Sequence, residues 1–288
     1  ERDSEVKGVI QITHGMAEAA HRYKRFAERL TDNGYIVYAH DQRGHGETAK
    51  KLGEFGYIGK DGYNRMVEDM REVTKEIRRR EEEDLPIILF GHSMGSFLTQ
   101  RYISLYGDNI DGVILSGTSN SPGPILNIGI RMAKREMDKS GPKAKSNRLN
   151  DMSFGSYNKK FRPNRTDFDW LSRDEEEVDK YIADPYCGGV FTTNFYYHFF
   201  EGLQETFKRE NLQGIPKDLP IYIFAGDKDP VGKMGRGVPR LVRTYKSLGI
   251  KDVTYKLYKD GRHEMLNETN RDEVMEDVLK WLNRHIEQ

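Results

Sequence analysis

Cysteine is nearly absent from this sequence, and neither sign of charge is in excess. Cys187 is the single cysteine among 288 residues, so an internal disulfide is excluded and a reducing, cytoplasmic location is expected. The 46 Lys and Arg residues balance 46 Asp and Glu residues, which leaves a formal net charge of zero. Because nucleic-acid-binding proteins normally present a strongly basic surface, we expect no nucleic-acid partner.

Long apolar runs and metal-binding patterns are also lacking. No apolar run reaches the length that crosses a bilayer, and no signal peptide is visible. No group of His, Cys, Asp or Glu has metal-ligand spacing, and no glycine-rich phosphate loop follows the first apolar segment. We therefore expect neither a metal nor any other cofactor. The chain opens on Glu1 rather than Met and enters a predicted strand almost at once, so we expect N-terminal residues to be missing.

What the sequence does contain is an alternation of short apolar segments with amphipathic ones. The short segments predict strands at residues 9–12, 35–39, 87–90, 112–115, 220–225 and 253–258. The amphipathic segments predict helices at residues 23–30, 66–77 and 238–248, and a last one with Asn270 as its N-cap. Strands that are apolar on both faces are typical of a mostly parallel sheet covered by helices on both sides. The predicted fold class is therefore α/β.

The alternation stops between residues 119 and 216, where prolines, asparagines, a basic segment and an aromatic segment replace it. We therefore predict a core formed by residues 1–118 and 217–288, interrupted by a lid, or cap, formed by residues 119–216. Because the cap follows a strand, it begins at the carboxyl edge of the sheet, where α/β folds bind their ligands.

Two segments of the predicted cap each have a functional and a structural interpretation. Residues 131–165 contain eleven Lys or Arg residues against three Asp or Glu residues. They could form a basic face that contacts an anionic membrane surface transiently, or a solvated surface balanced by the acidic run 167–179, and we favour the second. Residues 191–207 repeat a large apolar side chain at every fourth position. This predicts a helix packed on the core, and part of its face could line an apolar pocket.

The central motif is Gly-x-Ser-x-Gly at residues 91–95, where a strand of four apolar residues runs directly into a predicted helix. This arrangement is typical of a nucleophile elbow, a sharp turn that exposes Ser93. The serine backbone is strained in such a turn, and side chains at positions 91 and 95 would collide with the neighbouring strand and helix. Ser93 is therefore the candidate nucleophile.

A serine hydroxyl needs a base to take its proton and a carboxylate to orient that base. His263 follows the last predicted strand, and Asp227 and Asp229 follow the strand before it. The order Ser, Asp, His along the chain is the one that this kind of fold produces. We predict His263 as the base over the seven other histidines. We choose Asp229, at the loop tip, over Asp227, which is closer to the strand and suited to bracing the turn.

The oxyanion that forms on a substrate carbonyl needs two backbone N–H donors. Met94 follows the nucleophile at the positive end of its helix. Met16 follows Gly15 in the loop after the first strand, where glycine allows the chain to approach closely. We therefore predict the amides of Met16 and Met94 as the oxyanion hole.

These motifs occur together and in a fixed order. They are His14-Gly15-Met16-Ala17-Glu18 with Arg22-Tyr23, Asp41-Gln42-Arg43-Gly44-His45-Gly46, Gly91-His92-Ser93-Met94-Gly95, Gly226-Asp227-Lys228-Asp229 and Arg262-His263-Glu264. On both sides of the cap, the chain resembles the monoacylglycerol lipase and lysophospholipase group of serine α/β-hydrolases. The resemblance implies the α/β-hydrolase fold, supports Asp229 as the acid, and implies that Gly15, Glu18 and Arg22 organise the glycerol end of a substrate. The family's first two strands are not visible, and Thr48 stands where the family usually has serine.

We therefore expect a serine carboxylic-ester hydrolase that forms an acyl-enzyme on Ser93 and acts on a small-molecule acyl ester, a single-chain lipid. An amide or peptide hydrolase resembling proline iminopeptidase stays open. It would need cap carboxylates to hold a substrate amine, and the run 175–177 of three glutamates could be mistaken for such a cluster. The third alternative is a small-molecule receptor that retains the triad as a binding pocket.

Overall fold

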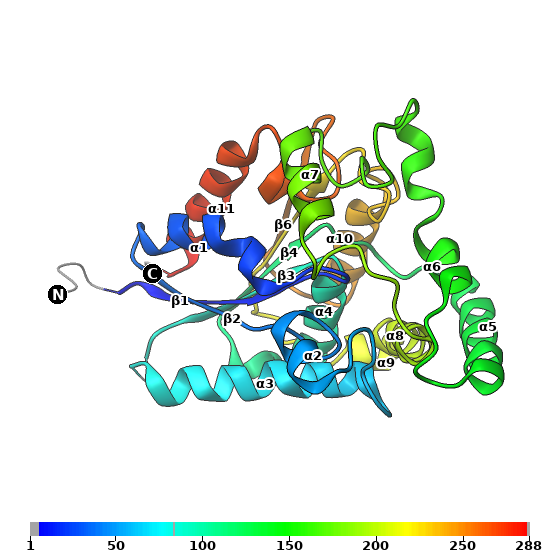
Figure 1. Ribbon diagram of the computed structural model, residues 1–288. Coiled ribbons are helices and arrows are strands. Elements are labelled where there is room, and N and C mark those ends of the chain that lie inside the picture. The colour runs from blue at the N-terminus through cyan, green and yellow to red at the C-terminus, as the bar shows by residue number, and fades with distance from the viewer. Residues whose placement is uncertain (1–5, 83, 287–288) are drawn as a thin grey trace.

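The computed structural model describes residues 6–82 and 84–286 of the chain (Figure 1). A six-stranded sheet forms its centre, with helices packed around it. Glu1, on which the expectation of a missing N-terminal segment rests, lies outside the described residues.

The sheet is parallel throughout. Its strands are β1 (Gly8–Thr13), β2 (Tyr35–Ala39), β3 (Ile87–His92), β4 (Gly112–Ser116), β5 (Ile221–Gly226) and β6 (Val253–Tyr258). They lie in the order β2-β1-β3-β4-β5-β6, and each neighbouring pair is parallel. All six carboxyl ends therefore lie at one edge, and the predicted α/β class is confirmed.

Helices cover both faces of the sheet. Outside the cap they are α1 (Lys24–Thr31), α2 (Gly46–Leu52), α3 (Gly62–Arg80), α4 (Met94–Tyr106), α10 (Gly237–Ser247) and α11 (Arg271–Ile286), with 3-10 turns η1 (Ala20–Tyr23), η2 (Gly107–Asn109) and η4 (Met265–Asn267). Val9 and Leu89 pack in one core cluster with α3, α4 and α10, whereas Ile10 and Ile88 pack in a second with α1 and α11. The division follows because successive side chains of a strand point to opposite faces. Within the described ranges, no helix is both long and apolar enough to cross a bilayer.

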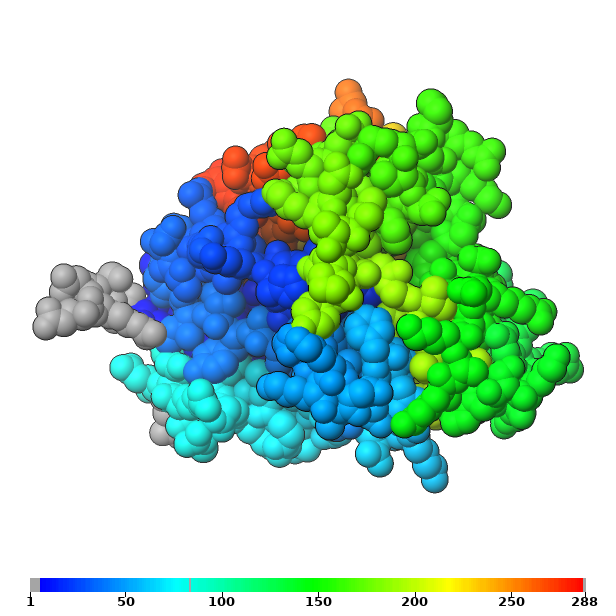
Figure 2. All heavy atoms as spheres, in the orientation of Figure 1, coloured from blue at the N-terminus to red at the C-terminus, as the bar shows by residue number. Residues whose placement is uncertain are grey.

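Five helices lie between β4 and β5, in the segment that the sequence predicts as the cap. They are α5 (Ile125–Ser140), α6 (Asn147–Phe154), α7 (Glu175–Ala183), α8 (Thr193–Thr206) and α9 (Arg209–Leu212), with the 3-10 turn η3 (Tyr157–Phe161). Helix α8 lies so close to α3 that a Cβ at Gly202 would stand 2.0 Å from the ring of Tyr63. Figure 2 shows the cap, coloured from green to yellow-green, resting directly on the N-terminal part of the core, coloured blue.

Helix α2 begins at Gly46, shortly after β2, and its first turn is capped from a distance. The Asp41 carboxylate accepts the N–H of Glu47 at 2.8 Å, and the Thr48 hydroxyl donates to the Asp41 carbonyl at 2.8 Å. Asp41 thus caps α2 from a position several residues before the helix. A usual N-cap residue directly precedes the first helical residue, so the sequence pattern for N-caps does not identify Asp41.

Candidate active site

Ser93 stands in the turn between β3 and α4, with a left-handed φ of 51° and a ψ of −119°. Such a conformation is strained for a non-glycine residue. A Cβ at Gly95 would lie 2.1 Å from the carbonyl oxygen of Thr13 at the end of β1. One at Gly91 would lie 2.4 Å from Thr99 Oγ1 on α4. The two glycines therefore let the chain turn sharply enough to present the serine at the carboxyl edge of the sheet.

The structure brings Ser93, His263 and Asp229 into one hydrogen-bonded chain. The Ser93 hydroxyl lies 2.9 Å from His263 Nε2, and His263 Nδ1 lies 2.9 Å from Asp229 Oδ1. Asp229 is fully buried, and its Oδ1 also accepts the N–H of Val231 at 2.8 Å. In this geometry His263 can take the serine proton while Asp229 holds the imidazole in the required tautomer.

Asp227 has a different position. Its carboxylate accepts the N–H of Asp260 at 2.9 Å and so links the loop after β5 to the loop after β6. The geometry places Asp229, and not Asp227, beside the histidine.

Burial and charge act in opposite directions on His263. Removal from water lowers the pKa of the imidazole, but the charge and hydrogen bond of Asp229 raise it by more, so this pKa lies above its ordinary value. The ring of His92 lies 4.8 Å from that of His263, and burial lowers the pKa of His92 to about 4. His92 therefore stays neutral near pH 7 and adds no positive charge beside the base.

The predicted oxyanion donors lie in the two segments that meet at the nucleophile. Met94 is the first residue of α4, where backbone amides have no acceptor within the helix. A Cβ at Gly15 would lie 3.1 Å from the Cβ of Ser93, so the loop after β1 runs directly against the serine. Met16 follows in that loop and lines the same cavity as Ser93. This arrangement can direct two N–H groups at a developing oxyanion.

The model of one protein family, described as serine aminopeptidase, S33, matches residues 4–270 of the chain. The chain belongs to this family.

Other comparisons agree with that assignment. The hydrolase is 28% identical over 285 residues to the monoacylglycerol lipase of Mycolicibacterium smegmatis, covering 99% of this chain and 91% of that protein. A thermostable carboxyl esterase from Bacillus coagulans in complex with glycerol matches it with a TM-score of 0.92 at 30% identity, covering 99% of this chain and 92% of the esterase. A lipase in an open form matches with a TM-score of 0.87 at 26% identity, again covering 99% of this chain and 92% of the other.

These similarities confirm the predicted α/β-hydrolase fold and the resemblance to the monoacylglycerol lipase group. The protein is a carboxylic-ester hydrolase. Within the described residues, no group of three or more His, Cys, Asp or Glu side chains is arranged to hold a metal ion.

A buried ion-pair cluster joins the loop after β1 to the loop that carries the histidine. The Arg22 guanidinium donates to both carboxylate oxygens of Glu264 at 2.7 Å and to Glu18 Oε2 at 2.7 Å. Glu18 Oε1 in turn accepts the N–H of Gly15 at 2.5 Å and the Tyr23 hydroxyl at 2.9 Å. Burial raises the pKa of Glu264, but the charge of Arg22 lowers it by more, to about 2. This buried cluster therefore links the loop after β1 to the loop that carries His263.

A cavity of about 350 Å³, which we call the polar chamber, lies over Ser93 and His263. Its cap wall is polar and aromatic and includes Asn150, Asp151, Asn158, Asp167 and Trp170. Gly15 and Glu18 also line the chamber, whereas Arg22 does not. Of the three residues for which the resemblance implies contact with the glycerol end, Arg22 is therefore the one that the structure turns toward protein carboxylates. Among the residues that the structure describes, no lysine or arginine lines the chamber.

A second cavity of about 420 Å³, which we call the apolar pocket, adjoins the polar chamber, since Met16 and Phe154 line both. Its other walls are largely apolar and include Phe97, Leu126, Tyr196, Phe199, Phe200 and Leu203. The aromatic repeat of residues 191–207 thus has both of the predicted roles. Phe191 and Phe195 are fully buried in the core, while the next turns of α8 line the pocket.

One residue at the site carries no signal in the sequence. Trp170, from the cap, packs its ring 5.0 Å from the ring of His263. It belongs to no motif and lies far from the histidine along the chain, so only the folded structure reveals the contact. The cap therefore touches His263 itself and also lines the cavity over Ser93.

Proposed function

We propose that this hydrolase cleaves esters of single-chain lipids, of the monoacylglycerol or lysophospholipid type, through an acyl-enzyme on Ser93. The serine oxygen attacks the ester carbonyl carbon while His263 Nε2 takes the serine proton. The amides of Met16 and Met94 stabilise the resulting oxyanion. The bond to the alcohol then breaks, and the alcohol leaves with the proton from His263.

The second half of the cycle repeats the same proton transfers with water. A water molecule gives a proton to His263 and attacks the acyl carbon. The bond to Ser93 Oγ breaks, the fatty acid leaves, and the proton on the imidazole returns to the serine. Asp229 remains ionised throughout and stabilises the imidazolium.

The observation that carries the proposal is the apolar pocket beside the polar chamber. Its volume of about 420 Å³ and its aromatic and aliphatic walls suit an acyl chain. Each buried methylene contributes about 0.8 kcal/mol, so esters with longer chains gain affinity for as long as the pocket can hold them.

The polar chamber favours a neutral alcohol over an anionic one. Glu18, Asp151 and Asp167 line it, and no lysine or arginine does so among the described residues. A phosphate group would meet carboxylates there without a cation to pair with. Monoacylglycerols are therefore preferred over lysophospholipids within the proposed class. The relative from Mycolicibacterium smegmatis that bears the name monoacylglycerol lipase supports this preference.

The test is hydrolysis of p-nitrophenyl esters of graded chain length by the wild-type protein and by Ser93→Ala. We expect kcat to fall on the order of 10⁶-fold in the variant, since removal of a triad nucleophile costs about that much. Ser104→Ala is the matched control. Ser104 also lies on α4, where its hydroxyl donates to the carbonyl of Arg101, and the variant should retain the wild-type rate. Rapid acid quench followed by mass spectrometry should find the acyl group on Ser93. Full activity of Ser93→Ala would overturn the mechanism.

One observation favours the amide-hydrolase alternative, and another argues against it. Asp151 and Asp167 line the polar chamber and could meet a substrate amine. The glutamate run 175–177 does not line it, and the carboxylate of Glu177 is bound by Arg25 and Lys180 at 2.7 Å each. Aminoacyl-naphthylamides assayed beside the esters separate the two functions. A receptor would instead show ligand-dependent stabilisation with negligible turnover of either substrate.

A further inference from the structure

The loop that carries His263 is hydrogen-bonded to the cap along its length. The N–H of His263 donates to the Trp170 carbonyl at 3.3 Å, and the N–H of Glu264 donates to the Leu171 carbonyl at 2.7 Å. The Arg262 guanidinium donates to the carbonyls of Asp169 and Ser172. The cap segment 169–173 and the histidine loop 262–264 therefore form one bonded unit.

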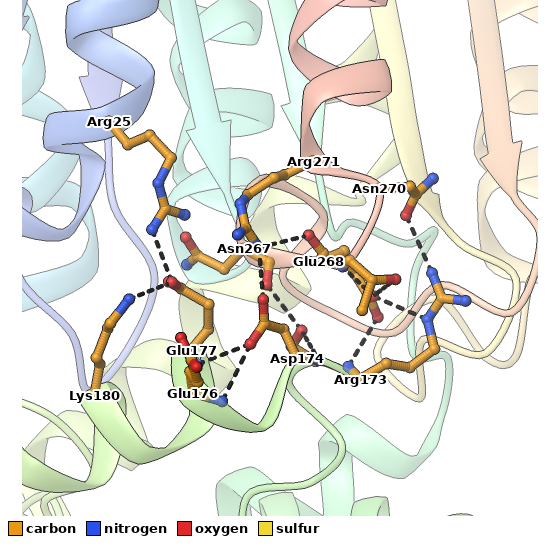
Figure 3. A network of polar contacts seen from close by, with 12 residues as sticks. Arg25, Arg173, Asp174, Glu176, Glu177, Lys180, Asn267, Glu268, Asn270 and Arg271 are labelled. Atoms are coloured by element: carbon orange, nitrogen blue, oxygen red, sulfur yellow. Dashed lines mark hydrogen bonds and ion pairs between the residues drawn. The ribbon is translucent and has the colours of Figure 1, made fainter.

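Glu268 closes this unit at its far end, and Figure 3 shows its carboxylate beside Arg173. Its Oε1 accepts the N–H of Arg262 at 2.9 Å and the N–H of Arg173 at 3.1 Å, so one oxygen joins the two segments. Its Oε2 accepts Nε of Arg173 at 2.9 Å and the N–H of Thr269 at 2.9 Å. Arg173 also donates to Asn270 Oδ1 at 3.1 Å. The carboxylate is 0% exposed, so these donors replace the hydration that burial removes from its charge.

We propose that Glu268 is a positioning residue for His263. It fixes the backbone of Arg262, the residue before the histidine, and it fixes the cap segment whose Trp170 ring packs against the imidazole. The inference rests on the proposed function, because it assigns a support to the base of that reaction. It also makes the cap part of the catalytic machinery: displacement of segment 169–173 moves the histidine as well as the cavity wall.

A second buried carboxylate, which lies in the cap, provides a matched comparison. Glu177 on α7 accepts hydrogen bonds from Arg25 and Lys180 at 2.7 Å each and joins the cap to the core through α1. Like Glu268 it is buried and ion-paired. It has no hydrogen bond to residues 262–264. Both carboxylates join the cap to the core. Of the two, Glu268 is the one that also contacts the histidine loop.

The experiment compares Glu268→Gln with Glu177→Gln on a p-nitrophenyl ester. In Glu268→Gln, an NH₂ group replaces one of the two carboxylate oxygens. Because an NH₂ group cannot accept hydrogen bonds, the N–H donors that faced that oxygen lose their acceptor. We expect kcat to fall by tenfold to about 10²-fold with KM within about twofold of wild type, because misplacement of a catalytic group by about 1 Å can cost this much. The apparent pKa of kcat/KM should shift as well. Glu177→Gln should lower the thermal midpoint while leaving kcat and the pH profile unchanged.

A readout independent of turnover is the downfield proton resonance of His263 Nδ1–H, which is bonded to Asp229. We expect it to move or broaden in Glu268→Gln and to keep its position in Glu177→Gln. If wild type hydrolyses no ester, the proposed function fails, and this resonance still decides the positioning role.

Arg173→Lys supplies a milder variant if Glu268→Gln does not fold. Lysine keeps a positive charge beside Glu268 but loses the guanidinium geometry that also reaches Asn270, so kcat should fall in the same direction by a smaller factor. The proposal is overturned if Glu268→Gln, or Arg173→Lys in its place, loses thermal stability with kcat, the pH profile and the proton resonance all at wild-type values.

Discussion

The polar chamber and the apolar pocket adjoin each other, are similar in volume and differ in the polarity of their walls. The polar chamber, of about 350 Å³, is lined by Ser93, His263 and several carboxylates and amides. The apolar pocket, of about 420 Å³, is lined by aromatic and aliphatic side chains, with Met16 and Phe154 as the residues common to both. An ester also has two ends of unequal polarity that meet at one carbonyl. Under the proposed function, the acyl chain would therefore occupy the apolar pocket and the alcohol the polar chamber.

The cavities also differ in what supports them. The chamber rests on buried charge, through the cluster of Arg22 with Glu18 and Glu264. The pocket rests on packing, since α8 and α5 lie against each other with Phe200 close to Gly129. Buried charge pairs respond to pH, whereas apolar packing responds to the volume of its side chains. Each cavity can therefore be perturbed while the other serves as an internal reference.

After Ser93→Ala, the largest expected effect is one that does not depend on the difference between the two cavities. Asp229→Asn removes the charge that raises the pKa of His263 and allows the wrong imidazole tautomer, and kcat should fall by about 10⁴-fold. Because the histidine serves every ester alike, the factor should be the same for short and long chains and for all alcohols. Asp227→Asn, in the same loop, should lower kcat by a far smaller factor, because Asp227 is bonded to Asp260 and not to His263.

The dependence of kcat/KM on pH provides a second test of the role of His263. The base must be neutral to accept a proton, and its pKa lies above the ordinary value of 6.5. Wild-type kcat/KM should therefore rise with pH through a midpoint above 6.5. A midpoint below 6.5, or a strong chain-length dependence of the Asp229→Asn defect, would contradict this assignment.

Acid should act on the support of the polar chamber. The pKa of Glu264 falls from an ordinary 4.5 to about 2 beside Arg22, so its charged form stabilises the fold by about 3 kcal/mol above pH 4.5. A carboxyl group with a lowered pKa loses this contribution as the pH falls through the window from 4.5 to 2. Urea unfolding at pH 7, 5, 4 and 3 should show the difference between wild type and Glu264→Gln shrinking toward acid. A difference that stays constant over this range would exclude the ion pair as its source.

Filling the apolar pocket should affect one end of the substrate only. Leu126 is buried and lines the pocket. In Leu126→Trp, exclusion of four methylenes at about 0.8 kcal/mol each would lower kcat/KM for long-chain esters by roughly 10²-fold, while butyrate esters keep their rate. Ile182→Trp is the control, since Ile182 is exposed on α7 and lines neither cavity. An equal loss for all chain lengths would place the acyl chain elsewhere.

The parts of this site that sequence could predict are those governed by local rules. The strained turn at Ser93 needs Gly91 and Gly95 beside it, and the parallel sheet brings the loops after β5 and β6 to the same edge. Residue type, spacing and order therefore sufficed to name Asp229 and His263 as partners of the serine.

The supports of the site follow no local rule. Arg173 and Glu268 are 95 residues apart in the chain, and Arg22 and Glu264 are 242 apart. Although Arg22 and Glu264 belong to recognisable motifs, nothing nearby in sequence indicates with which distant residue each of these four pairs. The same reason hides the capping of α2 by Asp41. Pairings of this kind depend on how the cap docks on the sheet, which single-sequence patterns do not encode.

The smallest expected effect tests the head-group end. Asp151 and Asp167 are exposed carboxylates on the cap wall of the polar chamber, so they should attract a cationic alcohol slightly and leave a neutral one unaffected. We expect the double variant Asp151→Asn with Asp167→Asn to lower kcat/KM for butyrylcholine by up to about fivefold, in line with 0.2–1 kcal/mol for exposed charge pairs. Hydrolysis of monobutyrin, which has the same acyl chain on glycerol, should not change. The effect should also shrink as salt rises from 20 to about 500 mM, because screening acts on exposed charges. A salt-independent loss, or an equal loss for both esters, would show that the two carboxylates shape the chamber by contact and not by charge.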